Sequence, residues 1–137
     1  MPVIYKYQKI SDAYTTYLLA EPDYELLGLG DRITELCTID GVTYISVPDG
    51  ITLPEQPEQI TVEEVALTDE LKAAIRLASP HVQLIDERVV MKIREKYSVN
   101  DEIKLLRLGA SDDFTAYNDY IEMCRAWGAA AKARLGV

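Results

Sequence analysis

Histidine and cysteine are the residue types with which this chain could carry out nucleophilic or acid–base chemistry, and it has one histidine and two cysteines. His81 follows Pro80 in the first turn of a predicted helix, where the helix dipole disfavours a protonated imidazole. A Cys–His pair would require Cys37 or Cys124 beside His81, and the sequence alone does not show such a contact. A small hydrolase that uses His81 is therefore the weakest of the functional alternatives.

The sequence gives equally little support for a metal site or a nucleotide site. Neither cysteine belongs to a Cys-x-x-Cys pair, so we expect free thiols in a reducing compartment rather than a zinc site or a disulfide framework. The carboxylates Asp112 and Asp113 follow Ser111, as is typical of a helix start. The run that opens with Gly28 and Gly30 resembles a dinucleotide fingerprint, but position 33, where the third glycine belongs, is Ile33. We expect no catalytic residue, no metal and no cofactor.

Charge is distributed unevenly along the chain. The net charge is −9, and residues 1–66 contain 3 basic and 12 acidic residues, whereas residues 67–137 contain 11 of each. An acidic front half repels phosphate backbones, which argues against nucleic acid as a partner. The imbalance favours either a basic protein partner or solubility alone. We predict no signal peptide and no membrane span, because the front lacks an apolar core segment and no run of about 18 apolar residues exists.

Aromatic residues supply the candidate contact surface. Nine tyrosines give the chain many side chains with an apolar body and a polar tip, which suits interfaces as well as half-buried sheets. Trp127 lies on the apolar stripe of the last predicted helix, either as a packing residue or as an interface anchor. The predicted partner-binding residues combine aromatic rings with neighbouring carboxylates: Tyr14, Tyr17, Tyr24, Glu21, Asp23, Glu25 and Trp127.

The front of the chain predicts strands. Residues 3–7 alternate, and residues 33–39 and 42–47 flank Asp40-Gly41, a pair typical of a type I′ hairpin turn. The hairpin register pairs Ile39 with Val42 and Cys37 with Tyr44, and it places Leu36 opposite Ile45. Residues 54–57 hold two prolines and predict a rigid spacer, and residues 60–67 partly alternate as a last strand. Residues 11–31 are ambiguous between helix and strand.

From Thr68 the periodicity is helical. Thr68 is a predicted N-cap, and Pro80 opens a helix that runs to about Tyr97. Ser98 with Asp101 makes an approximate capping box, and Gly109 closes that helix. Ser111 opens the last helix, whose final turns contain Lys132 and Arg134, and Gly128 in it either packs against a neighbour or ends the ordered helix early.

Together these patterns predict an α+β fold. A small antiparallel sheet with an Asp-Gly hairpin makes an acidic subdomain of residues 1–67, and three or four helices make a helical subdomain of residues 68–137. We expect the two to share one compact domain, with at least one helix packed on the sheet.

Three stretches carry a resemblance: "VPDGITLPEQPEQI", "SPHVQLIDERVVMKIREKYSVNDEIKLLRLG" and "YNDYIEMCRAWGAAAKA". They resemble small proteins of phage and prophage tail modules, in particular tail-fibre accessory or assembly proteins. The resemblance implies no catalytic residues and a non-enzymatic role: binding another phage tail protein, such as a tail fibre, in the host cytoplasm during assembly or in the virion tail. The alternative is a homo-oligomeric structural component of the tail that associates through the last helix and Trp127.

Overall fold

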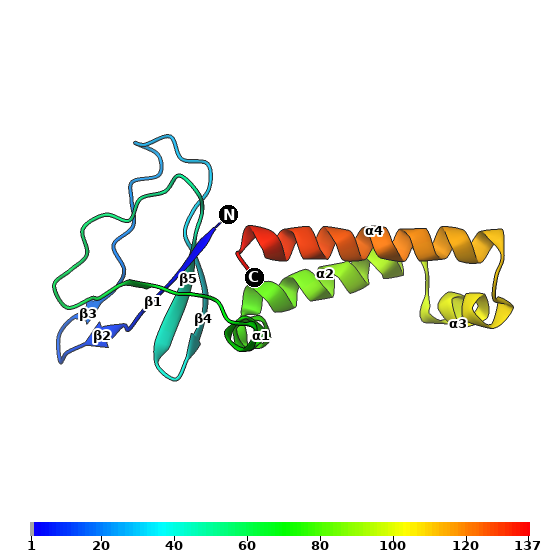
Figure 1. Cartoon of the computed structure of the whole chain (residues 1–137), viewed down its shortest axis with the longest axis horizontal. Helices are drawn as coiled ribbons and strands as arrows, with labels where there is room; N and C mark the ends of the chain where they lie inside the picture. The colour runs from blue at the N-terminus through cyan, green and yellow to red at the C-terminus, as the bar shows by residue number, and fades with distance from the viewer. Residues whose placement is uncertain (1) are drawn as a thin grey trace. The chain divides into compact units, whose positions relative to one another are not determined.

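The computed structural model describes residues 2–137 and has the predicted α+β fold (Figure 1). Six strands precede four helices. The strands are β1 (Val3–Tyr7), β2 (Ile10–Ser11), β3 (Thr16–Tyr17), β4 (Thr34–Ile39), β5 (Val42–Val47) and β6 (Glu63–Glu64). The helices are α1 (Asp69–Ala78), α2 (Pro80–Lys96), α3 (Val99–Leu108) and α4 (Asp112–Arg134).

The larger sheet is antiparallel with the strand order β4-β5-β1-β6, and β2 pairs with β3 in a separate ribbon. The β4–β5 turn has the predicted type I′ character, with positive φ angles of 50° at Asp40 and 79° at Gly41. Ile39 lies opposite Val42, as predicted. The prediction that Leu36 lies opposite Ile45 is wrong, because a β-bulge after Glu35 puts Glu35 in that place.

Each face of the sheet is covered. On one face, a core of Tyr7, Ile45, Val47 and Ile60 is packed by partly buried residues of the loops that cross it. α1 packs against β4, and its Ile75 is fully buried. The predicted packing of a helix on the sheet is thus confirmed.

The helix ends follow the predicted caps. The Thr68 hydroxyl accepts the amide of Leu71, and Ser98 and Asp101 form a reciprocal capping box. Gly109 ends α3 with a φ of 73°, a left-handed conformation in which glycine carries no Cβ penalty. α4 continues past Gly128 to Arg134, so Gly128 is a packing position and not a helix end.

The chain divides into two compact units. The β unit comprises Met1–His81 with Arg134–Val137, and the helical unit comprises Val82–Ala133. The β unit holds 14 acidic and 6 basic residues, a net charge of −8. The helical unit holds 9 acidic and 8 basic residues, a net charge of −1, so nearly all of the charge imbalance belongs to the β unit.

In the helical unit, α4 runs alongside α2 (Figure 1). The Tyr120 hydroxyl donates a hydrogen bond to the Lys92 carbonyl at 2.7 Å, and the Lys132 ammonium lies 2.5 Å from the Asp86 carboxylate. Gly128 is buried at this contact: a Cβ built there would lie 2.6 Å from Cγ2 of Val89.

Candidate partner-binding site

A hollow opens where β1 and β6 stop pairing. The two strands pair through Tyr5–Glu64 and Lys6–Glu63, and the Val65 amide donates to the Ile4 carbonyl at 2.8 Å. Two positions beyond Lys6 in this register, Gln8 and Thr61 lie on the wall of a cavity of about 300 Å³. The divergence of two strands, rather than a break in the core, therefore creates this space.

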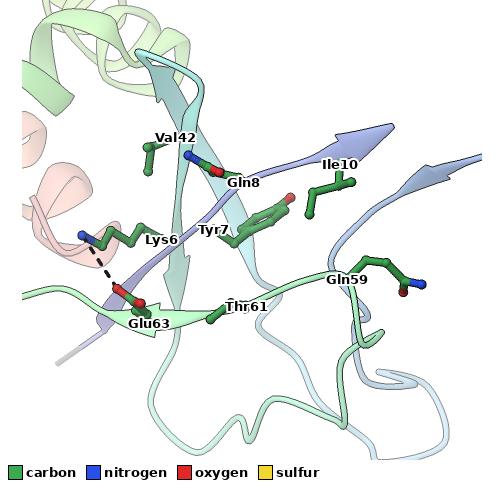
Figure 2. A pocket seen from close by; sticks show the side chains of 8 residues that line it. All are labelled: Lys6, Tyr7, Gln8, Ile10, Val42, Gln59, Thr61 and Glu63. Carbon is green, nitrogen blue, oxygen red and sulfur yellow. Dashed lines mark ion pairs between the residues drawn. The ribbon is translucent and has the colours of Figure 1, made fainter. Parts of the chain in front are cut away.

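The lining of this first hollow mixes polar side chains with the apolar groups of Ile10 and Val42 (Figure 2). Lys6 Nζ lies 3.9 Å from Glu63 Oε2 at one end, and Gln59 and Ile10 lie at the other. Tyr7 contributes its ring, and the Gln8 and Gln59 amides offer both donors and acceptors. The hollow therefore offers hydrogen-bonding groups beside apolar surface.

A second hollow of about 250 Å³ lies beside Tyr7, and Leu18, Leu19, Ile33 and Ile45 give it apolar walls. Lys9 Nζ and Glu35 Oε1 are 2.5 Å apart at its rim, and this hydrogen bond raises the pKa of Lys9. Burial raises the pKa of Tyr7, which is therefore a neutral phenol at physiological pH. Glu21, a predicted partner-binding residue, also lines this hollow.

Next to the hollows lies a stretch that we call the acidic segment, residues 10–32, which has five carboxylates and a single arginine. Short-range hydrogen bonds shape it. Asp12 Oδ1 accepts the amides of Tyr14 at 2.8 Å and Thr15 at 2.7 Å, which forms the turn between β2 and β3. Asp23 Oδ1 accepts the Leu26 amide at 3.0 Å.

Tyr24 connects this segment to the start of β4. Its hydroxyl donates to Glu21 Oε1 at 2.8 Å and accepts the Ile33 amide at 3.1 Å, and the Arg32 guanidinium lies 5.0 Å from its ring centroid. The segment is tied to the proline-rich spacer as well: Gln56 Oε1 accepts the Ala20 amide at 2.7 Å, and Gln56 Nε2 donates to the Ala20 carbonyl at 2.9 Å. Its loops thus have specific anchors despite their irregular backbone.

The structure separates the predicted partner-binding residues by role. Tyr14 is 97% exposed, and Glu25 is also exposed, so both are available for contact. Tyr17 packs partly against the core, whereas Asp23 and Tyr24 hold the backbone in place. These five residues and Glu21 all lie in or beside the acidic segment.

Sequence reasoning missed the apolar component of this surface. Ile10, Leu18, Leu26 and Leu27 are 41%, 53%, 81% and 62% exposed. The signal was present in Glu25-Leu26-Leu27-Gly28, where two leucines follow a carboxylate and precede a glycine, but the segment has no clear periodicity from which burial could be predicted.

Trp127, the remaining predicted residue, belongs to the helical unit. It is 36% exposed, and the Lys92 ammonium lies 4.7 Å from its ring centroid. This cation–π contact covers part of the indole and leaves an exposed edge.

The residues considered for catalysis or metal binding lie in ordinary settings. His81 is exposed in the first turn of α2, and Cys37 and Cys124 are buried free thiols. Burial raises the pKa of Cys37, which disfavours the reactive thiolate. Within residues 2–137, no group of three or more histidine, cysteine or carboxylate side chains is arranged to hold a metal ion.

In the same described part of the chain, none of the helices combines the length and the apolar character needed to cross a bilayer. No family model, curated protein or solved structure matches the chain, so any functional assignment depends on the residues and geometry described above.

Proposed function

We propose that this chain is a non-enzymatic tail accessory or tail-fibre assembly protein of a phage or prophage. It binds a basic segment of another tail protein through the acidic segment, in the host cytoplasm during assembly or in the virion tail. The resemblance of its sequence phrases to tail-fibre accessory and assembly proteins suggests the setting, and the surface of the β unit suggests the mode of binding.

One observation supports this proposal most strongly: exposed apolar side chains are interspersed with carboxylates along the acidic segment. Leu26 and Leu27 follow Glu25, and Leu18 lies three residues before Glu21. Apolar contacts provide affinity, whereas carboxylates select a basic partner and speed association. A carboxylate surface made only for solubility does not require exposed leucines beside it.

The hydrogen bonds that anchor the acidic segment also support the proposal. The Gln56 side chain bonds both the amide and the carbonyl of Ala20, and the Tyr24 hydroxyl bridges Glu21 and the Ile33 amide. A loop already held near its bound conformation loses less conformational entropy on binding than a free loop does. The acidic segment is therefore built as a recognition surface and not as a flexible tether.

Co-purification with the tail-fibre protein encoded by the same genome tests the proposal. Glu25→Lys with Asp31→Lys reverses two exposed carboxylates for which no side-chain hydrogen bond is described, so the loops keep their anchors. We expect recovery of the fibre protein to fall at least about tenfold at low salt, since opposite charges at an interface become like charges. The matched control, Glu87→Lys with Asp119→Lys in the helical unit, makes the same change in net charge and should leave recovery unchanged.

Equal loss in both double variants would reduce the effect to net charge and contradict the proposed surface. Binding that survives the Glu25 and Asp31 reversal at both low and high salt would also contradict it.

A second candidate is an oligomeric structural component of the tail. It is favoured by exposed apolar side chains of the helical unit, among them Met123 at 59% and Trp127 at 36%. If the chain is strictly monomeric in solution and Trp127→Ala leaves its molar mass in solution unchanged, association through the last helix is ruled out.

A further inference from the structure

The second hollow, beside Tyr7, combines an apolar interior with charged groups at its opening. The most buried residues of its lining are Ile45, which is 1% exposed, and Tyr7, which contributes its ring and is 6% exposed. Lys9, Glu21 and Glu35 also line the hollow, and all three side chains are exposed. A group that enters from solvent therefore passes charges before it reaches carbon surface.

The volume of this hollow limits what can enter it. Pockets for small-molecule ligands measure about 300–1,000 Å³. The second hollow measures about 250 Å³ and lies below that range. Its size therefore suits one side chain of a partner protein better than a free cofactor or substrate.

The charges at the opening do not cancel. Among the described residues of the lining, Glu21 and Glu35 supply two negative charges and Lys9 supplies one positive charge, which lies on Glu35 at 2.5 Å. Glu21 Oε1 accepts a hydrogen bond from the neutral Tyr24 hydroxyl at 2.8 Å. The nearby Arg32 guanidinium lies over the Tyr24 ring and not on the wall of the hollow. The excess negative charge, at Glu21, therefore favours a cationic side chain.

Lys9 shows how a cation is held at this opening. Its stem lines the hollow, and its ammonium bonds the Glu35 carboxylate. A basic side chain of a partner can contact Glu21 in the same way while its stem lies along Leu18 and Leu19. Arginine suits this position better than lysine, because a guanidinium is more weakly hydrated and matches the geometry of a carboxylate.

We propose that the second hollow is a subsite for one arginine side chain of the basic partner segment. The stem of the arginine lies over Leu18 and Leu19, and its guanidinium bonds Glu21. Lys9 is an internal competitor, since its charge at the same opening repels a second cation. This inference rests on the proposed function, because it names a residue type that the basic partner segment must carry.

Titration of the full chain with a capped Gly-Arg-Gly peptide measures binding at this subsite. NMR shifts of the Leu18 and Leu19 methyl groups report it, and we expect these methyl groups to shift. The matching citrulline peptide has nearly the same shape without the charge, so it should bind at least about fivefold more weakly. The matching lysine peptide should also bind more weakly than the arginine peptide.

Three variants separate the subsite from general charge. Glu21→Gln removes the charge but keeps Oε1 for the Tyr24 hydroxyl, and it should raise the dissociation constant of the arginine peptide at least about threefold. Lys9→Met removes the competing ammonium and should lower that constant about threefold. Glu25→Gln is the matched control, because Glu25 is an exposed carboxylate of the same segment outside the hollow, and it should have no effect.

Several outcomes would overturn the subsite: unshifted Leu18 and Leu19 methyl groups, equal binding of the arginine peptide and either matching peptide, equal effects of Glu21→Gln and Glu25→Gln, or no gain in Lys9→Met. If the peptide fails in this way while the fibre protein still co-purifies through Glu25 and Asp31, only the subsite is wrong. If the peptide binds as expected but the fibre protein does not co-purify, the subsite stands and the proposed partner is wrong.

Discussion

At the scale of single residues, Gln56 has a role that its surroundings in the sequence do not reveal. The proline-rich spacer was predicted to be rigid because each proline restricts its neighbours. The structure adds that the Gln56 side-chain amide bonds the backbone of Ala20, 36 residues earlier, at 2.7 and 2.9 Å. Hydrogen bonds between residues so distant in sequence depend on tertiary structure, and no local pattern predicts them.

Replacing Gln56 therefore tests how the acidic segment is positioned. In Gln56→Ala the Ala20 amide loses its acceptor, and one hydrogen bond contributes about 1 kcal/mol, so exchange of that amide should be roughly fivefold faster. Hydrogen exchange followed by NMR measures this. Gln59→Ala removes an exposed glutamine two residues after the spacer and should leave Ala20 unaffected. An unchanged Ala20 amide in the Gln56 variant would show that other contacts hold the segment.

The predicted contact residues illustrate what sequence can and cannot reveal about a site. The chain region was identified from its tyrosines and carboxylates, but the roles within it depend on hydrogen bonds. Asp23 and Tyr24 bond backbone amides, while Tyr14 is free in solvent. Composition identifies a surface rich in such groups, and only the folded backbone determines which groups face outward.

At the scale of elements, prediction succeeded where local chemistry controls the backbone. The Asp40-Gly41 turn, the Thr68 and Ser98 caps and the Gly109 helix end each depend on residues within a few positions of one another. The bulge in β4 was missed because it depends on how Leu36 fits beneath its neighbours, which the alternating pattern does not encode. The predicted last strand is reduced to Glu63–Glu64, since the residues before Glu63 diverge from β1 at the first hollow.

The close contact between α2 and α4 at Gly128 leads to a prediction about stability. Gly128→Ala should destabilise the wild type by about 1 kcal/mol in urea unfolding, because overpacking against Val89 exceeds the gain in helix propensity. In a Val89→Ala background the clash is absent, so the same change should stabilise by up to about 1 kcal/mol. Equal effects in the two backgrounds would show that the two helices do not pack closely at Gly128.

At the scale of the whole molecule, the two units have different surfaces. The β unit has a net charge of −8 and exposes leucines among carboxylates, whereas the helical unit has a net charge of −1 and exposes apolar side chains on α3. The surface of the β unit is the one for which we propose a basic protein partner. The half-chain charge count indicated this difference in charge, but no sequence pattern showed that apolar side chains of α3 stay exposed.

Hydrogen–deuterium exchange of the chain with and without the tail-fibre protein of the same genome tests the central claim most directly. The proposed contact predicts that the partner slows exchange within residues 10–32 and leaves Val82–Ala133 unchanged. Slower exchange confined to Val82–Ala133, with residues 10–32 exchanging as in the free chain, would contradict it.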